Sequence, residues 1–164
     1  MINHHRLCTV LVLAWGCAKA EPRGSVASDL IRVYVGVANG ADPSLLNEVL
    51  APSFERRGDP LSESATGIDG ARELIQKMRL DMPDLHVELV EELYDGNRAA
   101  IRWRMTGTDS GPGDFPPTGR HVEAIGMSFF EVRDGKLDVE WTIVDGVSLL
   151  TQLGFRIDPP SVSR

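Results

Sequence analysis

The sequence contains few cysteines: Cys8 and Cys17 are the only two among 164 residues. The rest of the chain therefore lacks the thiols needed for an internal disulfide, a cysteine nucleophile or a thiolate metal site. Basic residues are also in the minority, with 17 Lys and Arg against 24 Asp and Glu and a net charge of −7. Because a nucleic-acid-binding face needs clustered Lys and Arg, this balance argues against a nucleic-acid partner.

Long apolar runs and familiar catalytic motifs are missing as well. No stretch reaches the ~18 apolar residues that a membrane-spanning helix needs. The chain has neither a glycine-rich phosphate-binding loop nor a Gly-x-Ser-x-Gly nucleophile turn, so a nucleotide-binding protein and an α/β-hydrolase are both unsupported. What remains is an ordinary globular composition, 42% hydrophobic and 25% charged, at a length that suits one domain.

Residues 1–20 have the layout of an export signal, in which a positively charged start precedes the apolar stretch 7–16. The small residues at Ala18-Lys19-Ala20 would allow cleavage that releases a soluble chain. Alternatively, Leu13–Cys17 resembles a bacterial lipobox, in which Cys17 is lipidated and anchors the protein to a membrane. We favour lipidation of Cys17; a buried core helix is the remaining reading. In either export route we expect a periplasmic or extracellular protein, whose contact with a membrane is limited to that lipid.

Beyond the signal, apolar residues first recur at helical spacing. Asp42-Pro43 supplies an N-cap and a first helical position, and Asn39-Gly40 is typical of a C-cap. We therefore expect helices over Ser25–Asn39, from Asp42 to the residues before Pro52, and over Asp69–Leu80. A short helix over Val147–Leu153, ended by Gly154, should close the domain before a tail of residues 155–164.

From His86 onward the apolar period changes to two, which is typical of strands. The dipeptides Asp95-Gly96 and Asp134-Gly135 favour two-residue hairpin turns. We expect a four-stranded antiparallel meander over His86–Tyr94, Arg98–Gly107, His121–Arg133 and Lys136–Val144. Helices followed by such a sheet predict an α+β fold, with the helices on one face of a curved antiparallel sheet that encloses a pocket.

The last predicted strand carries the strongest candidate for chemistry. One set of alternate residues shares a face that we interpret as inward: Leu137, Val139, Trp141, Ile143 and Asp145. The other set would be a solvent face: Asp138, Glu140 and Thr142. Asp145 then ends an apolar row, where desolvation would raise its pKa toward the range of a general acid or base. The alternative is that Asp145 only caps the closing helix.

Other polar residues are weaker candidates. Arg102 and Arg104 lie on the strand face opposite Trp103, and we interpret them as a solvated stripe; facing the cavity, they would bind a carboxylate or polarise a carbonyl. His86 and His121 both begin strands, so we expect them at the surface. Since no third ligand accompanies them, the sequence gives no metal site.

The loop Gly107–Gly119 contains four glycines and three prolines. It is either a surface excursion or a lid over the mouth of the pocket. Phe115 is its one large apolar side chain and could close over a ligand.

With Phe115, three further aromatic residues are candidates for binding the substrate: Trp141, Trp103 and Tyr34. The expected partner is a small apolar molecule.

Several short motifs, each present once, are spread along the chain: Met82-Pro83-Asp84-Leu85, Gly107-Thr108-Asp109-Ser110-Gly111, Pro116-Pro117-Thr118-Gly119-Arg120, Asp134-Gly135-Lys136, and Trp141-Thr142-Ile143-Val144-Asp145 followed by Leu149-Leu150-Thr151-Gln152-Leu153-Gly154. Together they resemble the SnoaL-like polyketide cyclase (ester cyclase) family of the nuclear transport factor 2-like superfamily. The likeness runs over roughly Ser25–Gly154, within a domain that we place at residues 21–154.

This resemblance implies the cone-shaped fold that nuclear transport factor 2 and ketosteroid isomerase share. It also implies a cofactor-free intramolecular aldol cyclisation of a polyketide ester, with Asp145 as general acid and base. Two positions where family members often have histidine hold Arg57 and Asp109. We expect a cyclase- or isomerase-like enzyme, capable of forming a homo-oligomer. An exported binding module without catalysis and a scaffold domain remain the alternatives.

Overall fold

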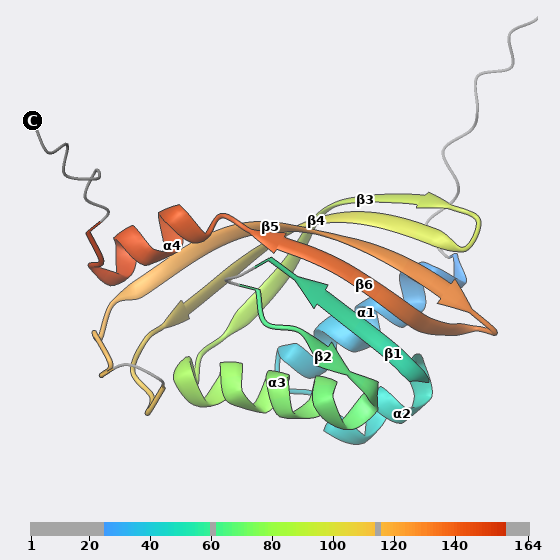
Figure 1. Ribbon diagram of the computed structural model, residues 1–164, viewed down its shortest axis with the longest axis horizontal. Coiled ribbons are helices and arrows are strands. Elements are labelled where there is room, and N and C mark those ends of the chain that lie inside the picture. Colours follow the sequence, from blue (N-terminus) through green and yellow to red (C-terminus); the bar gives the residue numbers. More distant parts are fainter. Residues whose placement is uncertain (1–24, 60–61, 114–115, 157–164) are drawn as a thin grey trace, which may run out of the picture.

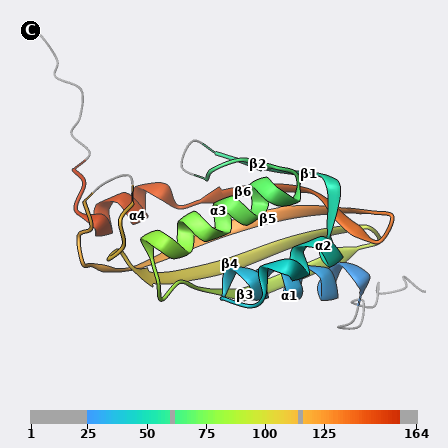
Figure 2. The same ribbon diagram turned by 90° about the horizontal axis from the view of Figure 1, so that it is seen from below.

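The computed structural model describes residues 25–59, 62–113 and 116–156. The elements in chain order are α1 (Val26–Ala38), a 3₁₀ turn (Pro43–Leu45), α2 (Leu46–Val49), β1 (Leu50–Gly58), β2 (Ala65–Thr66), α3 (Gly67–Asp81), β3 (His86–Asp95), β4 (Arg98–Thr108), β5 (His121–Arg133), β6 (Lys136–Val144) and α4 (Gly146–Leu153). Figures 1 and 2 show a curved sheet with α1, α2 and α3 on one face and α4 at one end. The α+β fold with helices on one face is thus confirmed.

The sheet has six strands in the order β2-β1-β6-β5-β4-β3. Strands β3 to β6 form the expected antiparallel meander, whereas β1 pairs with β6 in parallel and with β2 antiparallel. The four-stranded prediction was therefore incomplete. The apolar residues of the expected second helix divide among the 3₁₀ turn, the single turn α2 and the start of β1. The parallel pairing of β1 joins segments far apart in sequence, and no local pattern specifies it.

The two hairpin turns follow the glycine signals closely. The β5–β6 turn is Asp134-Gly135, and both residues have positive φ, 50° and 73°, as a type I′ turn requires. In the β3–β4 hairpin the pair Asp95 and Arg98 is still in register. The turn is therefore Gly96-Asn97, one residue later than predicted.

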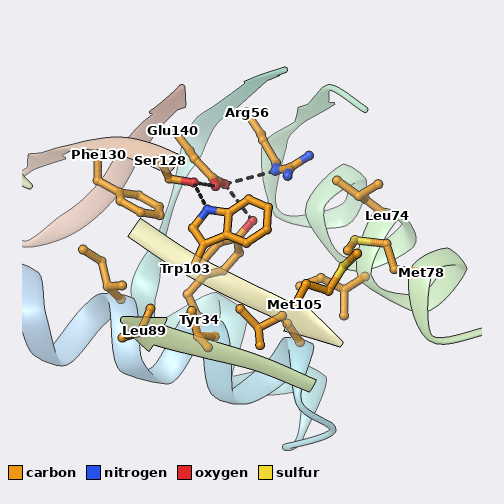
Figure 3. A pocket seen from close by; sticks show the side chains of 15 residues that line it. Tyr34, Arg56, Leu74, Met78, Leu89, Trp103, Met105, Ser128, Phe130 and Glu140 are labelled. Carbon is orange, nitrogen blue, oxygen red and sulfur yellow. Dashed lines mark hydrogen bonds and ion pairs between the residues drawn. The ribbon is translucent and has the colours of Figure 1, made fainter. Parts of the chain in front are cut away.

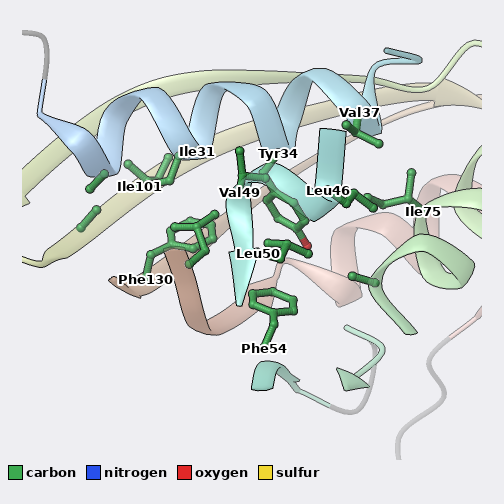
Figure 4. Packing of buried hydrophobic residues seen from close by; sticks show 14 residues of the cluster. Ile31, Tyr34, Val37, Leu46, Val49, Leu50, Phe54, Ile75, Ile101 and Phe130 are labelled. Carbon is green, nitrogen blue, oxygen red and sulfur yellow. The ribbon is translucent and has the colours of Figure 1, made fainter. Parts of the chain in front are cut away.

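The main core lies between α1 and the covered face of the sheet (Figure 4). Ser25 caps α1 by accepting a hydrogen bond from the Ser28 amide at 3.2 Å. The Tyr34 ring on the buried face of α1 packs edge-on against Phe54 and Phe130, with centroid distances of 5.9 and 6.3 Å. Such aromatic pairs add stabilisation beyond the area they bury.

From Asp138 onward the two faces of β6 are the reverse of those expected, whereas Leu137 is fully buried as predicted. Glu140 and Thr142 are buried on the face that the helices cover, whereas Trp141 is 51% exposed and Ile143 57% exposed on the opposite face. We call these the inner face and the outer face of the sheet. The inward reading of Trp141 was wrong because β5 and β6 carry large apolar side chains on their outer face. Five of these are exposed: Ile125, Met127, Phe129, Trp141 and Ile143.

Candidate active site

A cavity of about 80 Å³ lies between the inner face of the sheet and helices α1 and α3 (Figure 3). We call it the Glu140 pocket. Four polar side chains line it: Tyr34, Arg56, Ser128 and Glu140. The rest of its lining is apolar or aromatic: Ile31, Val35, Ala38, Leu74, Ile75, Met78, Val87, Leu89, Trp103, Met105 and Phe130. An apolar pocket with a few convergent polar groups is the usual form of a small-molecule site.

The carboxylate of Glu140 is the centre of the polar network. Its Oε2 accepts a hydrogen bond from the Tyr34 hydroxyl at 3.0 Å and one from the Arg56 Nε–H at 3.2 Å. Its Oε1 accepts a hydrogen bond from the Ser128 hydroxyl at 2.8 Å. All three partners donate to the carboxyl oxygens of Glu140, which act as the acceptors of the network.

Arg56 supplies the positive charge that a buried carboxylate needs. Its side chain is 12% exposed and that of Glu140 5% exposed. Arg56 reaches the pocket because β1 lies beside β6, where Arg56 and Glu140 are directly paired. An Nη1–H of the same guanidinium donates to the backbone carbonyl of Glu63, which holds the side chain in place from its other side.

Tyr34 stands on α1, facing the same carboxylate. Burial, and next the negative charge of Glu140, raise the pKa of Tyr34 well above its ordinary value of about 10. The phenol therefore keeps its proton across the physiological range and acts as a hydrogen-bond donor.

Ser128 links the carboxylate to the aromatic wall of the pocket. Its Oγ accepts a hydrogen bond from Trp103 Nε1 at 3.0 Å and lies 3.0 Å from Thr142 Oγ1. Trp103, Ser128 and Thr142 come from three adjacent strands, β4, β5 and β6, on the inner face. The hydroxyls of Ser128 and Thr142 are thus both hydrogen-bonded, as expected for polar groups removed from water.

A second pocket, of about 140 Å³, adjoins the first near α4. We call it the α4 pocket. Its own lining includes Met82, Val144 and Leu149, together with Ser62 and Glu63. Glu140, Tyr34 and Ser128 do not line the α4 pocket. The hydrogen-bond network of the carboxylate therefore belongs to the Glu140 pocket.

The predicted site residues separate into three groups. Trp103 and Tyr34 line the Glu140 pocket, although ligand binding by them stays a prediction. Trp141 lies on the outer face, where the Arg57 guanidinium stacks 4.8 Å from its ring centroid. Phe115 and Cys17 fall outside the described residues, so the lid and the lipid anchor also stay predictions.

Asp145 does not end a buried row. It is exposed, and its carboxylate accepts a hydrogen bond from the Ser148 amide at 3.0 Å as the N-cap of α4. The expectation of a low-dielectric setting for Asp145 was therefore wrong. It failed because the strand ends at Val144 and the helix begins at Gly146, which turns the side chain to the helix terminus.

Arg102 and Arg104 lie outside the cavity, as the solvated interpretation expected. They pair with Glu91 and Glu88 on the adjacent strand β3. His86 and His121 are exposed, also as expected. Of the two positions where the family often has histidine, Arg57 stacks on the outer face, and Asp109 lies in the β4–β5 loop, where its carboxylate accepts hydrogen bonds from Thr118 at 2.7 and 2.8 Å.

Sequence reasoning missed Glu140, Arg56 and Ser128. Glu140 was assigned to solvent, and Arg56 lies on a strand that was not predicted. One signal could have located the pocket: Ala124, Gly126 and Ser128 form a row of small residues on one face of β5. Such a row leaves space beneath the sheet, and Trp103 on β4 occupies part of it.

The described residues offer no group of three or more His, Cys, Asp or Glu side chains arranged to hold a metal ion. In the same ranges, no helix combines the length and hydrophobicity of a membrane span. The chemistry that the site itself can perform is proton transfer. A buried carboxylate can take a proton from an acidic C–H bond, and the neighbouring phenol and guanidinium can stabilise an oxygen that becomes negative.

Fold and site together define a cone-shaped α+β protein with a hydrogen-bonded carboxylate in an apolar interior pocket. Within that class, the chain belongs to the SnoaL-like polyketide cyclase family, whose family model matches residues 28–153. A comparison with curated proteins gave no match.

Solved structures are similar over most of their length. A SnoaL-like protein from Jannaschia sp. CCS1 has 20% identity and a TM-score of 0.71, covering 85% of this chain and 96% of that chain. IdmH from Streptomyces antibioticus has 29% identity and a TM-score of 0.69, covering 78% and 98%. TsrD from Streptomyces laurentii has 27% identity and a TM-score of 0.69, covering 79% and 95%.

Proposed function

We propose that the protein is a cyclase- or isomerase-type enzyme that transfers protons on a small apolar carbonyl compound, with Glu140 as general base and acid. The observation that carries the proposal is a buried carboxylate in an apolar cavity, surrounded by the donors Tyr34, Arg56 and Ser128. Membership of the SnoaL-like family supports it, as does the similarity to IdmH, which is provisionally assigned as a polyketide cyclase.

The reaction would begin when a substrate carbonyl takes the place of the carboxylate as acceptor for Tyr34 or Arg56. Glu140 then removes a proton from the carbon next to that carbonyl, and the electron pair forms an enolate whose oxygen the two donors stabilise. In a cyclisation, the enolate carbon attacks a second carbonyl of the same molecule. The new alkoxide takes the proton back from Glu140, so the carboxylate is regenerated.

Glu140 takes the role first expected of Asp145 for a geometric reason. Asp145 is exposed and caps α4, whereas Glu140 lines the cavity. Asp145 therefore serves as a matched control, because it is an acidic residue on the same stretch of chain.

The test measures exchange of α-protons for deuterium in 4-phenylcyclohexanone, followed by NMR in D₂O. This readout reports proton abstraction and needs no knowledge of the natural substrate. Glu140→Gln should slow enzyme-dependent exchange by ~10²–10⁴-fold, whereas Asp145→Asn should leave it unchanged. Exchange that survives Glu140→Gln would contradict the assignment. A wild-type protein that binds the ketone without exchanging its protons would favour the binding module instead.

We also propose that the protein is exported and tethered by lipid on Cys17. Cys17→Ser should move the protein from the membrane fraction to the soluble fraction. A wild-type protein that is soluble and begins at Glu21 would contradict the tether and would leave export intact.

A further inference from the structure

The Glu140 pocket and the α4 pocket meet at a shared boundary. Five side chains line both: Arg56, Leu74, Met78, Trp103 and Met105. Tyr34, Ser128 and Glu140 lie on one side of this boundary, and Arg56 belongs to it. The far side is lined by three apolar residues, Met82, Val144 and Leu149, and by the polar residues Ser62 and Glu63.

Trp103 is the fixed part of this boundary. Its Nε1–H donates to Ser128, and its ring lies over Gly126, its direct partner on β5. A Cβ at position 126 would lie only 2.1 Å from the ring, so the indole occupies space that any other residue would fill. The hydrogen bond to Ser128 and the space above Gly126 together fix the position of the Trp103 ring in the interior.

The other half of the boundary is adaptable. Met78 of α3 and Met105 of β4 are unbranched and can change shape at little cost, and Leu74 of α3 completes the boundary. Figure 3 shows the Trp103 ring between Glu140 and these methionines. A slim molecule can pass beside flexible methionines, whereas a bulky one would have to displace a ring that is locked in place.

We propose that Trp103 is a specificity-determining residue that divides the interior into two subsites, one for each end of an elongated apolar carbonyl compound. The carbonyl end lies in the Glu140 pocket, and the apolar remainder extends past the ring into the α4 pocket. This inference rests on the proposed function, because it takes Glu140 as the group that acts on the carbonyl.

The experiment compares two ketones by isothermal titration calorimetry: 4-phenylcyclohexanone, which is slim and long, and 2-adamantanone, which is a cage. Wild-type protein should bind the slim ketone at least tenfold more tightly. Trp103→Ala should merge the subsites, tighten binding of the cage and reduce the ratio of the two dissociation constants by tenfold or more. Trp141→Ala, a matched tryptophan on the outer face, should leave the ratio unchanged.

The ratio separates a steric role from a structural one. A Trp103→Ala protein that loses affinity for both ketones by the same factor would overturn the proposal, as would a wild-type protein with no preference or no binding. Trp103→Phe, which keeps an aromatic ring, should give an intermediate ratio and serves if the alanine variant does not fold. Failure of the proposed function shows separately, as α-proton exchange that survives Glu140→Gln while the ketone preference persists.

Discussion

Neighbouring residues on β6 belong to two different surfaces: Glu140 faces the covered interior, whereas Trp141 lies on the open face of the sheet. The adjacent strand β1 repeats the contrast, with Arg56 paired to Glu140 inside and Arg57 stacked on Trp141 outside. Beside its apolar core, the inner face holds charged and hydroxyl side chains that hydrogen-bond to one another, whereas the outer face of β5 and β6 holds large exposed apolar ones. The hydrophobicity of a strand's two rows is therefore not enough to tell which row faces the interior of this sheet. The hydrogen-bond and ion-pair partners of the polar residues must be considered as well.

The largest contrast should come from two phenylalanines on opposite faces. Phe54 is fully buried in the main core, whereas Phe129 is 38% exposed on the outer face. Phe54→Ala should lower the free energy of unfolding by ~3–5 kcal/mol, because it removes apolar contacts and leaves a cavity. Phe129→Ala should cost about 1 kcal/mol or less. Urea denaturation of both variants measures this, and equal losses would contradict the assignment of the two faces.

The two neighbouring arginines on β1 give the next contrast. Arg56→Met removes the cation beside buried Glu140 and should cost about 3 kcal/mol of unfolding free energy, because the carboxylate is left buried without its partner. Arg57→Met removes an exposed stacking interaction and should cost about 0.5–1 kcal/mol. Urea denaturation of both variants at pH 7 measures the two losses of unfolding free energy. A protein equally tolerant of both changes would remove the basis for a charged interior site.

Raising the pH above about 10 should destabilise the folded protein because of the buried Tyr34 hydroxyl. Its folded-state pKa is raised, so its stabilising contribution is complete below the ordinary pKa of about 10 and is lost as the pH rises above it, because only the unfolded phenol ionises. The unfolding free energy should fall by up to ~1.4 kcal/mol per pH unit there.

Tyr34→Phe should flatten this pH dependence, whatever its effect at pH 7. Tyr94 is the control: burial also raises its pKa, but it lies outside the cavity lining, and Tyr94→Phe should change the slope less. Melting temperatures between pH 8 and 11 provide the measurement. A slope that follows Tyr94 in place of Tyr34 would contradict the burial of the Tyr34 hydroxyl.

The outer face should show the smallest effect on stability and a distinct effect on association. Met127→Lys should change the unfolding free energy by about 0.5 kcal/mol or less, because the side chain is exposed. If the protein forms a homo-oligomer, this apolar face is the surface that association would cover, and the lysine should shift sedimentation toward the monomer. Wild-type protein that sediments as a monomer at every concentration would contradict self-association.

Local signals predicted most of the fold. The bounds of β3 to β6 agree with the sequence within one residue, because a period of two and Gly-containing turns are short-range features. Strand β1 was missed because its pairing with β6 is remote, and its first residues continue the apolar stripe of α2. The sequence therefore predicted the layers and left the width of the sheet undetermined.

The site was predicted only where an aromatic side chain marked it. Trp103 lines the pocket because β4 presents the apolar row of Ile101, Trp103 and Met105 inward, as its alternation indicated. Tyr34 lies on the buried face of α1 beside Ala27 and Ile31. Glu140 was assigned to the wrong side because the exposed row on β6 is more hydrophobic than the buried one. Which row is covered depends on α1, α3 and β1, and hence on tertiary structure that the strand itself does not encode.

The two tryptophans of the described domain allow the central claim to be tested in one spectrum. Trp103 lines the Glu140 pocket and Trp141 lies on the outer face, and each gives a separate indole N–H signal in a ¹H–¹⁵N correlation spectrum, assigned with Trp103→Phe and Trp141→Phe. Titration with 4-phenylcyclohexanone should shift the Trp103 signal and leave that of Trp141 in place. A shift of the Trp141 signal with Trp103 unmoved would place ligand binding on the outer face and contradict the interior site.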